Sequence, residues 1–100
     1  MSLKSRYHPL WRSTIRPFIL YLDGYCCRVC GTYSFHNDVH HNTDERHLCN
    51  VSQLFTLCPH HHRLVDTGKF TLGARDLTVQ NMSYSAIINF QSLVNTYKPK

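Results

Sequence analysis

Two short pairs of cysteine and histidine residues most constrain what this chain can fold into. Cys27 and Cys30 are separated by two residues, and Cys58 and His61 repeat that spacing beyond the intervening residues 31–57. Structural zinc takes four thiolate or imidazole ligands at the corners of a tetrahedron, and two such pairs from two turns can close one site. The sequence therefore predicts that these four residues hold one structural zinc ion.

Neighbouring residues leave some choices within this site open. Cys26 could replace Cys27, and His60 could replace His61. Cys49 has no partner at ligand spacing, so we expect it to be a buried or free thiol. Without a metal, the cysteines would be small buried hydrophobes and the histidines a surface cluster. Two correctly spaced pairs argue against that interpretation, because they are far more specific than one isolated pair.

A chain of this length gains stability from a bound metal ion that cross-links it. A chain of 100 residues forms one small domain that buries only about two-thirds of its unfolded surface. Small folds of this kind commonly depend on a disulfide or a metal, and the free energy of zinc binding then becomes folding free energy. We expect one domain over 1–100, with its motifs in 9–68 and a C-terminal extension over 69–100.

Composition narrows the setting and the class of partner. The odd count of five cysteines and the polar N-terminal segment predict an intracellular, reducing location, which is the host cytoplasm if a phage encodes the chain. No apolar run approaches the ~20 residues of a membrane span, which predicts a soluble protein. The formal net charge of +5 favours a polyanionic partner, although such a charge also serves solubility.

The segment 9–22 predicts a helix with one buried stripe. Pro17 lacks a backbone donor, so either the helix kinks there or a new helix begins with Pro17 in its first turn. Gly24 is suited to a left-handed C-terminal cap. The apolar residues at helical spacing are Trp11, Ile15, Ile19 and Leu22.

Further elements follow from turn signals and alternation. Around Tyr33, Phe35 and Val39 we expect two short strands with a turn at 36–38, and then a loop over 42–50. A short helix should start with Pro59 and stop at Gly68. Short strands are expected at 69–72 and 77–80, and a closing helix after the cap Ser83. Expected core contacts are Leu54, Leu57 and Leu64. One side of the closing helix carries a stripe that could serve the core, which we favour, or a dimer face: Ile87, Phe90 or Gln91, Val94 and Tyr97.

A second group of histidines is not used by the zinc site. His40 and His41 are adjacent on a predicted strand, where neighbouring side chains point to opposite faces unless the strand is distorted or ends. His62 projects about 100° around its helix from His61, toward a different centre. Metal ligands beside a proton acceptor suit phosphodiester hydrolysis. The alternative is a solvated surface cluster.

Together these residues resemble the HNH endonucleases of the His-Me finger (ββα-metal) superfamily. The resemblance covers residues 9–68, through "WRSTIRPFILYLDGYCCRVCG", "VHHN" and "LFTLCPHHHRL". It implies a small α+β fold, a ββα-metal finger with a structural zinc knuckle, to which the predicted N-terminal and C-terminal helices are added.

The resemblance also implies roles for the histidines. His41 matches the general base that activates water. His40 and His62 match ligands of one catalytic divalent ion, such as Mg²⁺, Mn²⁺ or Ni²⁺. The middle asparagine of the family motif corresponds to Gln53 here, and Asn50 lies three residues earlier, so either residue could take its role. The zinc ligands match as well, with histidine at one position that is usually cysteine.

The implied activity is metal-dependent endonuclease cleavage of DNA, as a nick or a double-strand cut. Double-stranded DNA is the expected partner, and a homodimer or a larger phage or repair assembly would be compatible with it. The expected phosphate contacts are Arg12, Arg16, Arg28 and Arg63. The alternative is a catalytically silent zinc module that binds nucleic acid or protein.

Overall fold

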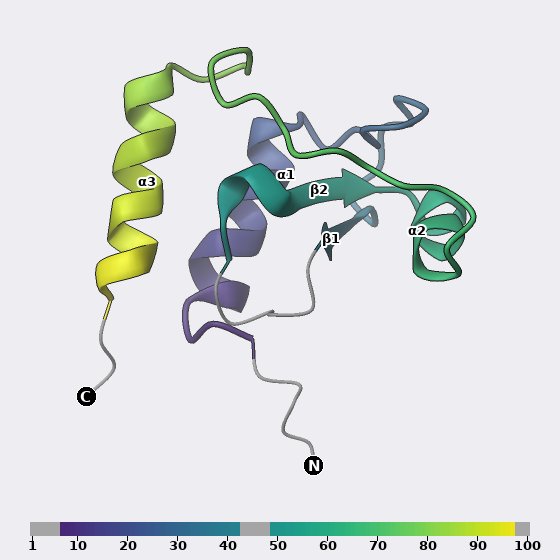
Figure 1. The fold of residues 1–100 in the computed structure, drawn as a ribbon, viewed down its shortest axis with the longest axis horizontal. Coiled ribbons are helices and arrows are strands. Elements are labelled where there is room, and N and C mark those ends of the chain that lie inside the picture. The colour runs from purple at the N-terminus through teal and green to yellow at the C-terminus, as the bar shows by residue number, and fades with distance from the viewer. Residues whose placement is uncertain (1–6, 43–48, 98–100) are drawn as a thin grey trace.

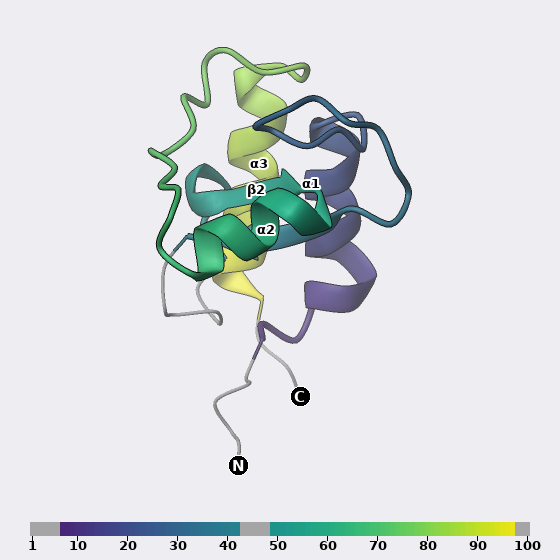
Figure 2. The ribbon, with the colours of Figure 1, turned by 90° about the vertical axis from the view of Figure 1, so that its right-hand side faces the viewer.

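The computed structural model describes residues 7–42 and 49–97. A two-stranded antiparallel sheet lies at the centre, with helical segments before, after and beside it (Figures 1 and 2). The coarse expectation of a small α+β fold, with a helix near each end and a strand pair followed by a helix, is confirmed. Among the described residues, no helix is long and apolar enough to cross a bilayer.

The predicted N-terminal helix is divided at its proline. A π-helix, η2 (Trp11–Ile15), leads directly into α1 (Arg16–Leu22), and Pro17 lies in the first turn of α1. Pro17 has no N–H, so the helical hydrogen-bond ladder is interrupted near this point. Just before it, the N–H of Ile15 donates to the carbonyl of Leu10, five residues back, at 3.0 Å. The expectation of a helix that begins with Pro17 in its first turn is confirmed.

The predicted strand around Tyr33 and Phe35 is wrong. Tyr33 makes only an isolated bridge to Cys26, and β1 (Asp38–His41) begins inside the predicted turn. Asn37 explains the difference, because its buried amide donates to two backbone carbonyl oxygens of this loop, each at 2.9 Å. Such side-chain hydrogen bonds offer the backbone an alternative to a ladder.

The strand pair carries the histidines into position. β1 pairs antiparallel with β2 (Leu54–Leu57), so that Asp38 lies opposite Leu57 and His41 lies opposite Leu54. A single 3₁₀ turn, η3 (Val51–Gln53), precedes β2. The predicted loop at 42–50 falls mainly on residues 43–48, which lie outside the described residues.

α2 (Pro59–Asp66) follows β2 after one residue and completes a strand–strand–helix unit. Pro59 occupies its first turn and Gly68 has a φ of +77°, as predicted. The strands predicted at 69–72 and 77–80 are wrong, because this described stretch is irregular, with bends and one turn at 77–78. Within it, the carboxylate of Asp76 accepts hydrogen bonds from the backbone and hydroxyl of Thr78, which fixes a turn.

The closing helix, α3 (Tyr84–Thr96), forms as predicted, and its N-cap hydroxyl on Ser83 accepts the Ala86 N–H at 3.2 Å. Its Phe90 ring stacks on Phe18 of α1 with centroids 3.7 Å apart. α3 therefore covers the N-terminal helix. The main apolar core consists of Ile15, Ile19, Leu20, Leu22, Val39, Cys49, Val51, Leu54, Ile87 and Val94.

A buried ion pair fastens the segment between α2 and α3 to the rest of the fold. Arg75 meets the carboxylate of Asp23 with two hydrogen bonds, of 2.8 and 3.0 Å, and both side chains are fully buried. The same carboxylate accepts the Thr56 N–H of β2 at 3.1 Å. A buried carboxylate needs such partners, because an unpaired buried charge is strongly destabilising.

Candidate metal centres

Two turns supply the residues of the predicted zinc site. The first is the knuckle after α1, where the N–H of Gly31, at a φ of +79°, donates to the carbonyl of Cys27 at 2.8 Å. The N–H of Arg28 donates to the carbonyl of Thr56 at 2.8 Å and holds the knuckle against β2. The second turn is the start of α2, where Cys58 is the N-cap. The sheet thus brings the two turns together.

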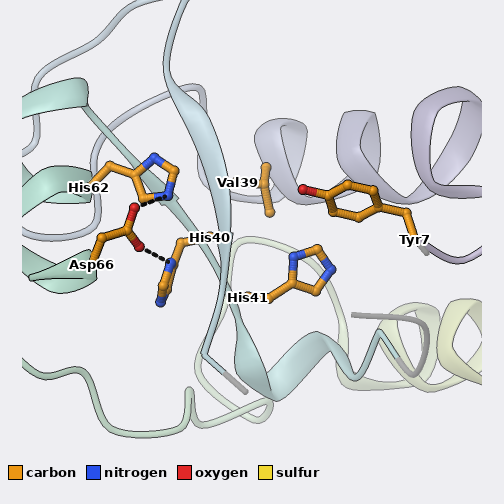
Figure 3. A pocket seen from close by; sticks show the side chains of 6 residues that line it. All are labelled: Tyr7, Val39, His40, His41, His62 and Asp66. Atoms are coloured by element: carbon orange, nitrogen blue, oxygen red, sulfur yellow. Dashed lines mark ion pairs between the residues drawn. The ribbon is translucent and has the colours of Figure 1, made fainter. Parts of the chain in front are cut away.

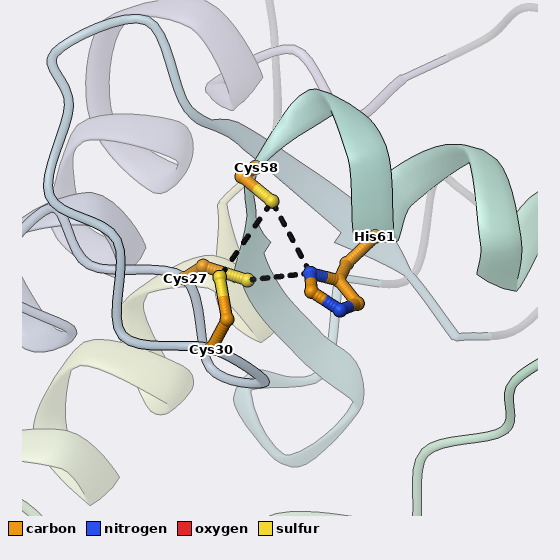
Figure 4. A group of neighbouring side chains, drawn as sticks. All are labelled: Cys27, Cys30, Cys58 and His61. Atoms are coloured by element: carbon orange, nitrogen blue, oxygen red, sulfur yellow. Dashed lines mark hydrogen bonds between the residues drawn. The ribbon is translucent and has the colours of Figure 1, made fainter.

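The four predicted ligands converge from these turns (Figure 4). Sγ of Cys58 lies 3.3 Å from Nδ1 of His61 and 3.9 Å from Sγ of Cys30, and Sγ of Cys27 lies 3.9 Å from Nδ1 of His61. A tetrahedron with zinc–sulfur bonds of about 2.3 Å has edges of about 3.8 Å. The donor set and its spacing therefore fit a structural zinc ion.

The thiols of this cluster differ in their protonation. Hydrogen bonds from the hydroxyl and backbone N–H of Thr32 lower the pKa of Cys30 to about 6, which favours its thiolate at neutral pH. Burial raises the pKa of Cys58 above its ordinary value. Zinc binding must therefore displace a proton from Cys58, since only a thiolate is a ligand.

The open choices within the site are resolved by position. Cys27 and His61 belong to the cluster. Cys26 instead donates its thiol hydrogen to the carbonyl of Gly24 at 3.4 Å, and His60 is exposed on α2. Cys49, expected to be buried or free, is a buried thiol outside the cluster.

A second cluster forms where β1 faces α2, and it lines a pocket of about 160 Å³ (Figure 3). His40 of β1 and His62 of α2 both face Asp66, with nitrogen–oxygen distances of 3.6 Å in each case. One donor atom from each of the three lies within 4.8 Å of the others. Two imidazoles and a carboxylate are a ligand set that suits a divalent transition metal.

Asp66 is the member of this cluster that the sequence-based assignment missed. It follows His62 by four residues on α2, which places both side chains on one face of the helix. That spacing was available in the sequence. Asp38, at the start of β1, also approaches His62, with 3.7 Å between Oδ2 and Nδ1.

His41 lines the same pocket as His40, although the two are adjacent on the strand. His41 is the last residue of β1. Adjacent side chains can reach one site where a strand ends, as the sequence analysis required. The ring of His41 packs against Trp11, with centroids 4.4 Å apart, and against Tyr7 at 5.3 Å. Its Nε2 lies 3.7 Å from Sγ of Cys49.

The two candidates for the motif asparagine differ in their contacts. Gln53 binds the residue that follows His41, because its carbonyl accepts the Asn42 N–H at 2.8 Å and its Oε1 accepts the Asn42 amide at 3.2 Å. Asn50 is exposed and its side chain makes no capping hydrogen bond to η3. Gln53 is therefore the one that fastens the chain beside the pocket.

The four arginines expected to contact DNA fall into two groups. Arg16 pairs with Asp38 at 3.4 Å, and Arg28 pairs with Asp23 at 3.3 Å. Arg12 and Arg63 are exposed, and neither forms an ion pair with another described residue. The second group has its charge available for a partner.

Comparison of the chain with protein-family models, with curated proteins and with solved structures found no match.

Proposed function

We propose that this protein is an HNH-type endonuclease that hydrolyses phosphodiester bonds of DNA with one catalytic divalent ion. The observation that carries the proposal is the pocket in which His40, His62 and Asp66 converge and which His41 also lines. This pocket lies on the strand–strand–helix unit whose first helical turn contributes to the Cys₃His cluster.

The chain offers separate groups for holding an ion and for moving a proton. His40, His62 and Asp66 would hold Mg²⁺, Mn²⁺ or Ni²⁺. When bound, such an ion stabilises the charge that develops on the phosphoryl group and on the leaving oxygen. Asp66 also faces both imidazoles at 3.6 Å, so its negative charge favours their convergence before an ion arrives.

His41 is the proposed general base. Burial raises the pKa of the neighbouring Cys49 to about 11, so this thiol is neutral at physiological pH. Nε2 of the His41 imidazole faces the sulfur of Cys49 at 3.7 Å, and a neutral imidazole can accept a proton from a water molecule. Packing against Trp11 limits the rotation of the ring.

Binding of DNA would depend mainly on phosphate contacts. Arg12 and Arg63 are exposed cations on η2 and α2, and α2 also carries His62. Contacts of this kind give an affinity that decreases with salt and has little base preference.

Cleavage of a supercoiled plasmid tests the proposal. Zinc-loaded wild type, with Mg²⁺, Mn²⁺ or Ni²⁺ added, should cleave, and His41→Ala should lower the rate by roughly 10²–10⁴-fold, the usual contribution of a general base. His60→Ala is the matched control, because His60 is exposed on the same helix as His62 and outside both clusters. Equal rates for His41→Ala and wild type would contradict the assignment of the base.

A silent zinc-binding module is the second candidate function, and one observation favours it. His62 lies between the carboxylates of Asp38 and Asp66, at 3.7 and 3.6 Å. The side chains of the second cluster can therefore pair with one another without a metal ion. Titration of the zinc-loaded protein with Mn²⁺ separates the two candidates. A folded wild type that binds no second ion and cleaves with none of the three metals would contradict the endonuclease and favour the module.

A further inference from the structure

Gln91 of α3 reaches out of its helix to the backbone that precedes β2. Its Nε2 donates to the carbonyl of Cys49 at 3.1 Å, and its Oε1 accepts the N–H of Val51 at 2.6 Å. One side-chain amide thus binds the residues on both sides of Asn50. The contacts join positions separated by about forty residues in the chain, so they fix where this backbone runs.

The backbone that Gln91 binds needs such support. Cys49 has a φ of +44°, in the left-handed region that residues with a Cβ rarely adopt. A conformation of this kind persists only where surrounding contacts determine it. One hydrogen bond of Gln91 is made to the carbonyl of the strained Cys49, and the other to the N–H of the buried Val51.

The strained residue is also the one that touches the proposed base. Sγ of Cys49 lies 3.7 Å from Nε2 of His41, and Cys49 is 2% exposed, so the thiol has little room to move independently of its backbone. The position of the Cys49 backbone therefore sets the position of the Cys49 thiol, which lies against the imidazole of His41. Contacts thus run without interruption from Gln91 through Cys49 to His41.

We propose that Gln91 is a positioning residue for His41, which makes the C-terminal helix a working part of the active site. The inference deepens the proposed function and depends on it. Gln91 does not touch the pocket itself, since the residues that line the pocket come from the N-terminal segment, β1 and α2. Its effect on cleavage is exerted through the backbone that it holds.

The packing of α3 does not need this amide. Ile87 and Val94 are the buried residues of the helix, and Phe90 stacks on Phe18. The side chain of Gln91 also donates to Asn95 of its own helix at 3.0 Å, a local and exposed contact. Loss of the amide can therefore be separated from loss of the helix.

The test compares Gln91→Met, which keeps the length of the side chain and removes both hydrogen bonds, with the control Asn95→Ala, which leaves both in place. Both are made in the zinc-loaded full-length chain and compared at saturating Mn²⁺. For Gln91→Met we expect kcat to fall roughly 10- to 100-fold, the scale of a displacement of about 1 Å at a reacting group, with little change in KM. The affinity for Mn²⁺ and the zinc content should match the wild type, and the Val51 amide should exchange its hydrogen faster.

Gln91→Glu provides a second variant in case the first does not fold. It keeps an acceptor for Val51 but places a second oxygen against the Cys49 carbonyl in place of the donor, so its kcat should also fall below that of wild type. A kcat equal to wild type in the folded variants would overturn the proposal, and so would a loss of Mn²⁺ affinity that accounts for the whole decrease. An inactive wild type would instead overturn the endonuclease function itself.

A double-mutant cycle checks the route through Cys49. If Gln91 acts on His41 through this residue, Cys49→Ala should lower kcat alone, and adding Gln91→Met should lower it by much less than the product of the two single effects. Multiplicative losses would show that the residues act independently, which would overturn the route.

Discussion

The two candidate metal clusters both include residues of α2, but they differ in how many ligands they offer and in how exposed those ligands are. In the Cys₃His cluster, Cys27 and Cys58 are buried and the donor atoms already lie near the edges of a zinc tetrahedron. In the other cluster the Asp66 side chain is 58% exposed and the group borders an open pocket. Closed four-ligand sites are structural, whereas catalytic sites keep a position open. The comparison supports a structural role for the first cluster and the catalytic role that we propose for the second.

The largest effect is expected from removing a ligand of the closed cluster. Cys58→Ala should lose zinc and unfold the domain, because the free energy of metal binding is part of the folding free energy. Zinc content and a thermal melt followed by circular dichroism measure this. Cys26→Ala should keep both zinc and melting transition. A cooperative, unshifted melt for Cys58→Ala would remove the distinction between the clusters.

Removing a ligand of the open cluster should separate chemistry from folding. For His62→Ala we expect binding of Mn²⁺ to be lost and plasmid cleavage to fall at least ~100-fold, since a bound metal supplies several kcal/mol of transition-state stabilisation. Zinc content and the melting curve should stay close to those of wild type. Unfolding of this variant would mean that the second cluster is structural as well.

A smaller effect is expected from Asp66→Asn. The amide keeps the shape of the side chain but removes the charge that faces His40 and His62. Affinity for Mn²⁺, measured by isothermal titration calorimetry, should fall roughly 10- to 100-fold, because a neutral amide is a weaker ligand than a carboxylate; the loss is similar in size to that from removing a partner of a metal ligand. Unchanged affinity would place Asp66 outside the metal site.

The smallest effect is expected from a change of pH, which should alter the zinc affinity of the Cys₃His cluster. Zinc affinity should fall as the pH falls, because the raised pKa of Cys58 requires it to release a proton on binding at neutral pH. Below about pH 6 the decrease should steepen, since Cys30 is then protonated as well and must release an additional proton. Calorimetry in buffers of different ionisation enthalpy counts these protons. A constant slope across pH 6 would contradict the low pKa of Cys30.

Local spacing predicted much of this molecule. The zinc ligands, the proline in the first turn of α1, the cap Ser83 and the limits of α2 all depend on residues a few positions apart. The strands expected near Phe35 and after Gly68 fail, because buried or local hydrogen bonds outweigh alternation there. The roles of the histidines and arginines stay predictions.

What the sequence did not reveal depends on long-range contacts. Asp66 could have been found from its helical spacing to His62. In contrast, no local pattern predicts that Arg75 meets Asp23 or that Gln91 binds Cys49, since these pairs are brought together only by the completed fold. Both missed pairs attach the extension to the motif-bearing part.

The buried pair of Asp23 and Arg75 sets a limit on how this domain can be dissected. A fragment that ended at residue 68 would contain every metal ligand, yet it would leave the carboxylate of Asp23 inside the protein with only the partly exposed Arg28 as a cation. A transplant of the metal-binding motif into another scaffold would inherit the same unbalanced charge. The smallest transferable unit therefore includes the extension or replaces Asp23 by a neutral side chain.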